Sequence, residues 1–412
     1  MRLKKTLLLL LPLAVQAAAQ PADAPDHFTP TTQPCFQVDY ASPTADKPQS
    51  KLWFMDGCWW ALLPRASGPS LWQRTDAGWK EHTDIAEKLS GIPGRADVWP
   101  DSSGVTAAGV RSLRKANPLI VVFRLERKGD SSETAWEPHV LGELRPPSPE
   151  DAIETATVMR DSAGTTWVAA VAGVKVCVWV SPESASEWSG PVILAEGVKP
   201  DDICVVTPLP ENQIAVLWSD QGREAVLMRA HTDGAPAEDW REEEVVEMGN
   251  RTADDHLNTV LTPDGTLWVA SKNEVDQDGK PQFVLRVRSP EGRWSNHPYG
   301  IRETTTRPSR PIAVAAGNPA IVFTGYGTND LAAPLPHDTR IVFARIDPSV
   351  QGWVTPPRAV ITPAKEYESP IQNVTGPRDP FPTDTPWIVL ASDQEGRVYE
   401  ADLRQAFADD MK

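Results

Sequence analysis

Short runs of apolar residues separated by polar turns recur along the whole chain. Between residues 255 and 294 this pattern predicts strands at 255–261, 266–271 and 283–288, and a fourth strand that starts at Trp294. Runs rich in β-branched and aromatic residues, bounded by Pro, Gly and Asp turns, are typical of β-strands. The pattern therefore predicts an all-β protein.

Tryptophans mark equivalent places in successive units, spaced by about fifty residues. The set that follows a polar turn is Trp79, Trp136, Trp188, Trp240, Trp294 and Trp353, and a second set inside the units is Trp167, Trp218, Trp268 and Trp387. Units of four strands at this period indicate a β-propeller, in which each blade buries its faces against its neighbours. We expect most of these tryptophans to lie in that core.

We predict a seven-bladed β-propeller of four-stranded antiparallel blades, with six blades as the alternative. The last unit lacks a clear fourth strand after 397–403, and residues 35–40 could supply it and close the ring without an open edge. One propeller domain would then span residues 35–403, after a lead-in at 20–34 and before a tail at 404–412. The innermost strands are expected to begin near Lys51, Asp97, Ala156, Asp202, His256, Arg310 and Pro370.

Composition agrees with this architecture and excludes one class of partner. The chain holds 40 prolines and 26 glycines in 412 residues, which leaves little room for long helices. It has 56 Asp and Glu against 40 Lys and Arg, a formal charge of −16 at pH 7. Nucleic acid is not an expected partner, because phosphate binding needs a basic surface.

The first residues are typical of an export signal. Residues 1–5 are positively charged, residues 6–15 are mostly leucine, and small residues follow at Ala17 and Ala19. We therefore predict a signal peptide over 1–19, cleaved near Ala17–Ala19, and a secreted or periplasmic protein. The apolar run is too short to span a bilayer, so no membrane span is expected after cleavage. A monomer is expected.

The predicted mature protein contains four cysteines, and export would place them in a compartment that permits disulfides. They are Cys35, Cys58, Cys177 and Cys204, which allow three pairings among which the sequence does not choose. Some of them could equally be small buried side chains.

Charged residues are expected to gather on one face of the ring. The strands of a blade alternate in direction, so the links into each innermost strand and the loops between second and third strands share a face. The residues placed there are Lys51, Asp97, Asp201, Asp202, Asp254, Asp255, His256, Arg307 and Arg310 at the links and strand starts, Asn258 two positions further on, and Asp220, Gln221, Lys272 and Tyr326 in the loops. They could form a ligand site, or salt bridges that close the mouth of the channel.

Three chemistries fit this ring of charges. Crowded carboxylates raise one another's pKa, which suits general acid–base catalysis. Asp202, Asp255 and His256 could instead hold calcium, although no calcium-loop spacing is present. In the third arrangement, Arg310 and Lys51 would bind an anionic sugar while His256 acts as base.

The chain also resembles a known group of propellers. Ser289-Pro-Glu-Gly-Arg-Trp294 is similar to a degenerate Asp-box of sialidase-like proteins. Residues 51–361 resemble secreted bacterial BNR-type propellers without an assigned activity, through Lys51-Leu-Trp-Phe-Met-Asp-Gly57, Trp218-Ser-Asp-Gln221, Ala253-Asp-Asp-His-Leu-Asn258 and Arg310-Pro-Ile312. The resemblance implies a propeller fold. Some propeller-type polysaccharide lyases use His, Tyr and Arg, which His256, Tyr326 and Arg310 match by type.

The leading hypothesis is an exported propeller that binds a glycan or polysaccharide at the charged channel mouth and could also act on it. The first alternative is a polysaccharide lyase or glycoside hydrolase, with His256, Asp255, Asp202 and Tyr326 as candidate catalytic residues. The second is a protein-interaction scaffold that uses the outer faces of the ring. The sequence does not decide between an enzyme and a binding protein.

Overall fold

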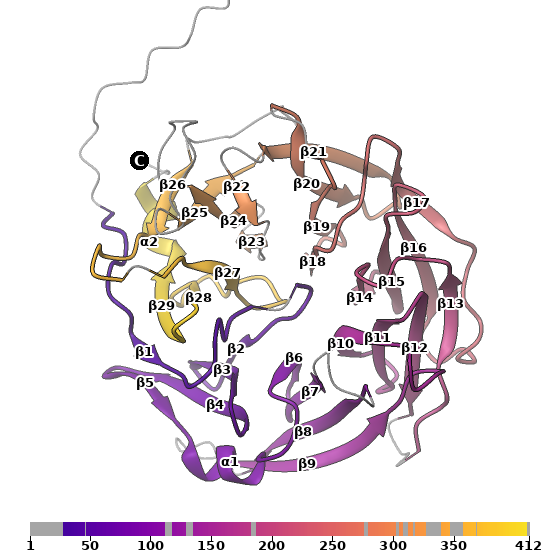
Figure 1. Ribbon diagram of the computed structural model, residues 1–412, viewed down its shortest axis with the longest axis horizontal. Coiled ribbons are helices and arrows are strands. Elements are labelled where there is room, and N and C mark those ends of the chain that lie inside the picture. Colours follow the sequence, from indigo (N-terminus) through magenta and orange to yellow (C-terminus); the bar gives the residue numbers. More distant parts are fainter. Residues whose placement is uncertain are drawn as a thin grey trace, which may run out of the picture.

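Seven antiparallel sheets surround a central axis in the computed structural model (Figure 1). The prediction of seven blades is confirmed, and the alternative of six is wrong. The structure describes residues 28–45, 47–111, 118–128, 135–182, 187–275, 279–301, 305–307, 312–315, 318–326, 339–346, 357–367 and 369–409. The predicted signal peptide lies outside these residues.

Each blade runs from an inner strand at the axis to an outer strand at the rim. Blade 1 is β2 (Leu52–Met55), β3 (Cys58–Arg65), β4 (Gly68–Thr75) and β5 (Gly78–Glu81), and blade 2 is β6 (Arg95–Asp101), β7 (Gly104–Val110), β8 (Ile120–Lys128) and β9 (Ala135–Leu144). Blade 3 is β10 (Ile153–Arg160), β11 (Thr166–Ala172), β12 (Lys175–Ser181) and β13 (Val192–Glu196). Blade 4 is β14 (Cys204–Leu209), β15 (Gln213–Asp220), β16 (Ala225–Thr232) and β17 (Glu244–Met248).

The remaining blades follow the same order, with one variation. Blade 5 is β18 (Leu257–Leu261), β19 (Leu267–Lys272), β20 (Pro281–Arg288) and β21 (Trp294–Ile301). Blade 6 has two short inner strands, β22 (Thr305–Arg307) and β23 (Ile312–Ala315), both paired with β24 (Asn318–Tyr326), and then β25 (Thr339–Arg345) and β26 (Arg358–Ile361). Blade 7 is β27 (Gln372–Thr375), β28 (Ile388–Ser392), β29 (Arg397–Asp402) and β1 (Phe36–Gln37).

Blade 7 closes the ring with both ends of the chain. Strand β1 pairs antiparallel with β29, with Phe36 opposite Val398. The Phe36 ring stacks on Trp72 of blade 1 at a centroid distance of 4.2 Å. One short strand therefore completes blade 7 and packs against its neighbour, as the predicted closure by residues 35–40 requires.

Tryptophan side chains fill the spaces between blades. Trp60, Trp167 and Trp218 are among the largest fully buried side chains. Others hydrogen-bond across a blade boundary: Trp79 donates Nε1–H to Glu400 of blade 7 at 2.6 Å, and Trp294 donates to Glu244 of blade 4 at 2.5 Å. The prediction that the tryptophans lie in the core is confirmed for Trp167 and Trp218, whereas Trp79 and Trp294 are half-buried and pack against the core.

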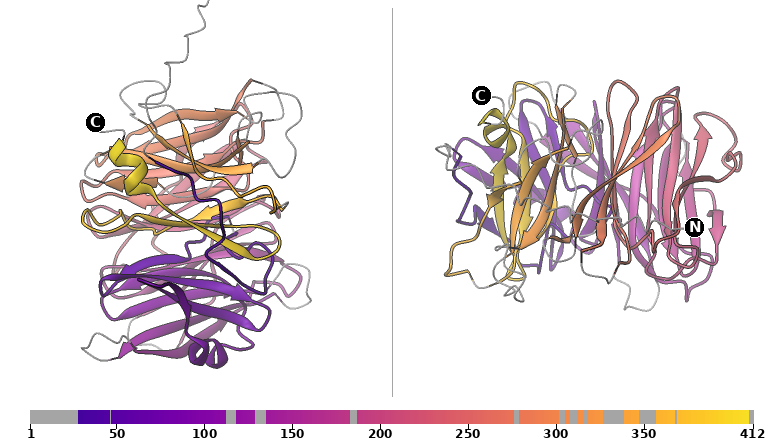
Figure 2. Two further views of the ribbon diagram at one scale, coloured as in Figure 1. Left: turned by 90° about the vertical axis from the view of Figure 1, so that its left-hand side faces the viewer. Right: turned by 90° about the horizontal axis from the view of Figure 1, so that it is seen from above.

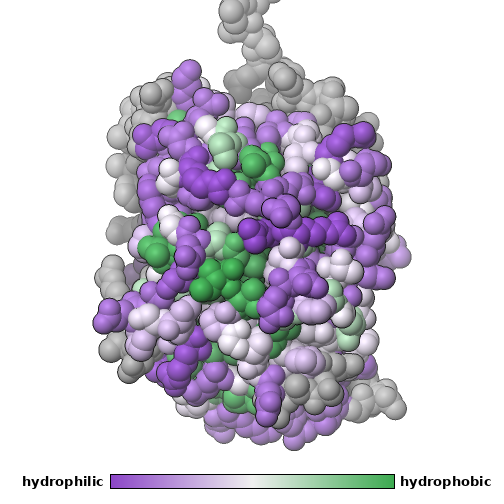
Figure 3. All heavy atoms as spheres, turned by 90° about the vertical axis from the view of Figure 1, so that its right-hand side faces the viewer, coloured by the Kyte–Doolittle hydropathy of each residue, from purple (hydrophilic) through white to green (hydrophobic). Residues whose placement is uncertain are grey.

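Two short helices accompany the ring, α1 (Thr83–Lys88) and α2 (Leu403–Asp409), both at its rim (Figure 2). Within the described residues, no helix is long and apolar enough to cross a membrane. A space-filling view of the rim over blades 3 and 4 shows an apolar patch framed by polar side chains (Figure 3). Ile193 of β13 and Val245 of β17 are among the exposed apolar residues of these outer strands.

The ring closure can be tested at Phe36. We expect Phe36→Ala to lower the free energy of unfolding by about 2 kcal/mol, because a partly buried aromatic ring between two blades is lost. Urea denaturation followed by tryptophan fluorescence would measure this. Thr32→Ala, an exposed position of the same segment, is the control. Equal stability of the two variants would show that the Phe36 contact does not contribute to closure.

Candidate functional site

The chain between β1 and β2 crosses the mouth of the channel. It is visible as the indigo segment that reaches the middle of the ring in Figure 1. Gln49 donates its amide N–H to the Ala156 carbonyl of blade 3 at 3.1 Å, and Ser50 donates its backbone N–H to Asp97 of blade 2 at 2.6 Å. Thr44 contacts Ser392 of blade 7. This segment holds three blades together at the axis.

The predicted charges of blade 5 do come together there. His256 Nδ1 and Asp255 Oδ1 share a hydrogen bond of 2.5 Å. The other Asp255 oxygen forms an ion pair with Lys47 of the crossing segment, and Lys47 also pairs with Glu154 of blade 3 at 3.1 Å. Lys272 pairs with Asp254. We call Lys47, Glu154, Asp254, Asp255, His256 and Lys272 the mouth network.

Most of the mouth network is closed to solvent. The His256 side chain is 3% exposed and that of Asp255 is 16% exposed. Burial by itself would raise the pKa of Asp255, but His256 and Lys47 together hold this pKa well below its usual range. Asp255 is thus a permanent anion whose two oxygens already have cationic or hydrogen-bonding partners. The network links blades 3 and 5 as a structural closure.

The predicted residues of blade 4 lie apart from this network. Asp202 is 1% exposed and accepts backbone N–H groups from Lys199 at 2.7 Å and from Gln221 at 3.2 Å. Gln221 accepts in turn from Lys199 Nζ at 3.4 Å. Asp220 accepts the backbone N–H of Arg223 at 2.9 Å, whereas Asp201 is exposed beside them. Asp202 thus shapes the turn that leads into β14, and Asp220 shapes the turn between β15 and β16.

Lys51 and Asp97 lie inside the channel. The Lys51 ammonium is fully buried and donates to Gln49 Oε1 at 3.0 Å and to the Ala96 carbonyl at 3.2 Å. Asp97 is fully buried as well, and one of its oxygens accepts the Val158 N–H at 2.8 Å. The same oxygen forms an ion pair with Arg378. Both predicted ligand-binding residues therefore use their charges within the protein.

Arg378 is a residue that the sequence patterns did not single out. It lies in the connection between β27 and β28, which turns into the channel in Figure 1. Its guanidinium joins Asp97 of blade 2 to the Val206 carbonyl of blade 4, the latter at 3.0 Å. No spacing in the sequence marks it, because its role depends on a loop that reaches across the ring.

Three of the other predicted site residues lie in strands of blades 5 and 6, and the fourth lies outside the described residues. Asn258 is buried in β18. Arg307 is in β22 and Tyr326 ends β24, on the blade with the interrupted inner strand. Arg310 lies outside the described residues. The proposed catalytic roles of His256, Asp255, Asp202 and Tyr326 stay predictions.

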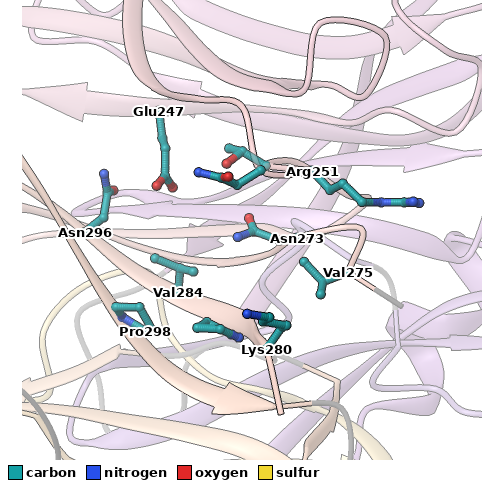
Figure 4. A pocket seen from close by; sticks show the side chains of 11 residues that line it. Glu247, Arg251, Asn273, Val275, Lys280, Val284, Asn296 and Pro298 are labelled. Atoms are coloured by element: carbon teal, nitrogen blue, oxygen red, sulfur yellow. The ribbon is translucent and has the colours of Figure 1, made fainter. Parts of the chain in front are cut away.

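An open cleft of about 590 Å³ lies between blades 4 and 5 (Figure 4). The link that borders it also carries Asp254 and Asp255, and the loop that borders it follows Lys272, so the cleft opens on the same face as the mouth network. It is bounded by β17, the link from β17 to β18, the loop from β19 to β20, and the strands β20 and β21. Its lining residues are Glu247, Asn250, Arg251, Thr252, Asn273, Val275, Lys280, Pro281, Val284, Asn296 and Pro298. Polar groups alternate with small apolar surfaces, as in many sites for small polar ligands.

A fully buried arginine organises the cleft from beneath. Arg286 of β20 forms an ion pair with Glu247 of β17. Its other N–H groups donate to Asn273 Oδ1 at 2.9 Å and to Asn296 Oδ1 at 3.1 Å. Glu247, Asn273 and Asn296 come from two blades and a loop, so Arg286 fixes one wall of the cleft relative to the other.

The link that forms the rim of the cleft has a strained backbone. Asn250, Arg251 and Ala253 have φ angles of 54°, 55° and 85°, after Gly249 at 88°. Residues with a side chain rarely adopt this left-handed region, and such strain concentrates at functional sites. The sequence pattern placed Lys272, the neighbour of Asn273, on this face, but it did not single out Glu247, Arg251 or Asn296. The available signals were the strand predicted to start at Trp294, which contains Asn296, and Gly249, a turn residue between Glu247 and Arg251.

The structure also bears on metals and cysteines. The oxygens of Asp202 and Asp255 already accept bonds, and calcium binding there stays a prediction. Within the described residues, Glu126, Glu137 and His139 form a group of possible metal ligands on blade 2, but Lys128 pairs with both carboxylates. All four cysteines are free thiols, and Cys177 and Cys204 are buried as small core side chains.

Fold and cleft together define a seven-bladed propeller with an open polar site beside a closed channel mouth. An ulvan lyase of polysaccharide lyase family PL25, solved with bound -[GlcA(1-4)Rha3S]-, is similar over 89% of this chain and 96% of its own, with a TM-score of 0.53 and 11% identity. A polysaccharide lyase, Uly1, matches over 89% and 92% (TM-score 0.44, 10% identity). A mutant Trypanosoma rangeli sialidase displaying trans-sialidase activity matches over 77% and 60% (TM-score 0.45, 11% identity).

These likenesses are structural. No family model and no curated protein sequence matches the chain. At 11% identity, the similarity to the ulvan lyase shows a shared propeller fold and no more. The predicted membership in the BNR group stays a prediction.

The link between Asp97 and Arg378 can be tested with a double-mutant cycle. We expect Arg378→Met to lower the free energy of unfolding by about 3–5 kcal/mol, because a buried carboxylate loses its cation. Asp97→Ala added to Arg378→Met should cost much less than the sum of the two single changes. Urea denaturation would measure these changes, and additive effects of the two substitutions would contradict the coupling. Arg145→Met, at an exposed position, is the control.

Asp202 predicts a specific dependence of stability on pH. Burial raises the pKa of Asp202 to about 6, so the folded protein holds this proton more tightly than the unfolded chain does. The free energy that this proton contributes to stability is complete below about pH 4, the pKa of Asp202 in the unfolded chain. It is lost as the pH rises through about 6. We expect the wild type to lose about 2–3 kcal/mol relative to Asp202→Asn between about pH 4 and pH 7.

Urea denaturation of both proteins across that range would measure the difference. Asp201→Asn, at the exposed neighbouring position, is the matched control. A difference between wild type and Asp202→Asn that does not change with pH would contradict the expected proton uptake.

Proposed function

We propose that this protein is an exported propeller that binds a glycan or polysaccharide, and that the site is the cleft between blades 4 and 5. The observation that carries the proposal is the cleft itself. About 590 Å³ of open space is lined by three asparagines and by charged side chains from two blades. Side-chain amides and charged groups are the partners that sugar hydroxyls and carboxylates require.

The geometry favours the cleft over the channel mouth as the binding site. At the mouth, His256 and Asp97 are buried and their polar atoms bond within the protein. A glycan would have to displace the segment that carries Lys47, Gln49 and Ser50 to reach them. The cleft needs no such rearrangement, since Arg251 and Lys280 at its edge are exposed.

The same comparison favours binding over catalysis at His256. A general base must come within hydrogen-bond distance of the proton that it removes. The His256 ring is 3% exposed, and its Nδ1 is already bonded to Asp255. A lyase or hydrolase that uses His256 would therefore need an opened mouth, whereas a binding protein would not.

The proposal predicts where a bound glycan protects the backbone. A panel of neutral and acidic polysaccharides would be added to the protein, and thermal unfolding would identify ligands that raise the melting temperature. Amide hydrogen exchange should then slow in residues 247–252 and 279–284. It should not slow in the turn at 161–165, which joins β10 to β11 on the opposite face.

Two results would overturn this function. The absence of any stabilising glycan in the panel would remove the binding proposal. Protection confined to the rim or to the opposite face would instead favour the protein-interaction scaffold. Release of reducing ends or of unsaturated uronates in the same samples would make the protein an enzyme.

A further inference from the structure

The cleft is lined by hydrogen-bond donors that have no partner among the described residues. The Thr252 hydroxyl is buried in its wall and bonds to no atom of the described residues. A buried hydroxyl without a partner costs free energy, which a ligand atom in the cleft would recover. Thr252 therefore points to an occupant with hydrogen-bonding groups.

Two asparagines have a fixed orientation in the cleft. A guanidinium can only donate, so the amides that contact Arg286 must turn their oxygens toward it and their NH2 groups away. This holds for Asn273 and for Asn296, from different elements of blade 5. Neither NH2 group has a partner within the described part of the chain. Arg286 thus fixes the orientation of both amides and leaves their NH2 groups as donors for a ligand. Figure 4 shows Asn273 and Asn296 at the cleft.

The charged side chains described around the cleft leave an excess of one positive charge. Glu247 is neutralised by Arg286 beneath it, and Arg251 lies 3.5 Å from a carboxylate oxygen of Glu274. Lys280 is exposed at the edge, and no carboxylate of the described residues pairs with it. One positive charge and two amide donors therefore line the same cleft, and the Thr252 hydroxyl is buried in its wall. Such a set fits an anion better than a neutral group.

We propose that the cleft binds the carboxylate of a uronic acid residue in an acidic polysaccharide. Lys280 would pair with the carboxylate, and Asn273 and Asn296 would donate their NH2 groups to its oxygens or to neighbouring hydroxyls. Val275 and Pro281 offer apolar surface for the faces of the sugar rings. This inference rests on the proposed glycan-binding function and narrows it to one chemical class.

The net charge of the protein sets the conditions for binding. A formal charge of −16 repels a polyanion at long range, while the local donors act only at contact. At about 0.15 M ionic strength the repulsion is screened beyond about 8 Å. A short acidic oligosaccharide should therefore bind at physiological salt and bind less well at low salt.

The test compares two ligands that differ only in charge. Titration calorimetry would measure the binding of a short oligogalacturonate and of its methyl ester to the full protein at about 0.15 M salt. We expect the acid to bind at least about tenfold more tightly than the ester, because the ester cannot form the ion pair. Lys280→Gln should reduce the affinity for the acid by about tenfold and leave the affinity for the ester unchanged.

Asn296→Asp is a second variant, chosen because it keeps the oxygen that accepts from Arg286. The new carboxylate still accepts from Arg286, but it replaces the NH2 donor with a negative charge. We expect Asn296→Asp to lower the affinity for the acid more than Lys280→Gln does. Lys88→Gln in α1, at an exposed lysine far from the cleft, is the control and should bind as the wild type does.

The outcomes separate this inference from the function on which it rests. Equal binding of acid and ester, with both weakened by Asn296→Asp, would keep the glycan site and overturn its preference for uronates. Binding of the acid that neither variant changes would overturn the placement in the cleft. If neither ligand binds while another glycan of the wider panel does, only the uronate class is lost. If no glycan binds at all, the function itself is wrong.

Discussion

The structure depends on the closure of the ring at the axis. A propeller blade buries its faces only when it has a neighbour on each side, so an open ring would expose two apolar faces and a strand edge. Backbone pairing of β1 with β29 completes the outer edge of blade 7. At the axis, Arg378 and Asp97 join blades 2, 4 and 7 through a buried ion pair. The crossing segment between β1 and β2 exists because the chain must return from that closing strand to start blade 1.

This closure uses the charges that the propeller gathers at the channel mouth. Strand starts from different blades converge there, which brings Asp97, Asp255 and His256 close to the axis. Low solvent access strengthens each pairing but makes an unpaired charge costly, so every such group needs a partner. Lys47 and Arg378 supply those partners from segments outside the blade pattern. The converging charges thus pair with one another and close the mouth of the channel, and the open cleft lies beside them.

The cleft between blades 4 and 5 arises from a different feature, the backbone of one link. The left-handed conformations at residues 249–251 and 253 turn the chain from the outer strand of blade 4 to the inner strand of blade 5. This turn leaves space above Arg286, whose two terminal nitrogens then orient the surrounding carboxylate and amides. A buried guanidinium and a strained link are costly for stability alone. Their position beneath and around an open cleft is consistent with a binding role.

The sequence by itself determined the repeat and the closing strand, and it favoured seven blades over six. These follow from local signals, because alternating apolar residues, turn residues and spaced tryptophans act within about fifty residues. It also placed Lys272, Asp254 and Asp255 on one face. Only the tertiary structure decided which charges have partners, since Lys47–Asp255 and Arg378–Asp97 join residues far apart in the chain. The same holds for the cleft, where Glu247 and Asn296 meet through Arg286: no local pattern encodes a contact between the outer strands of two blades.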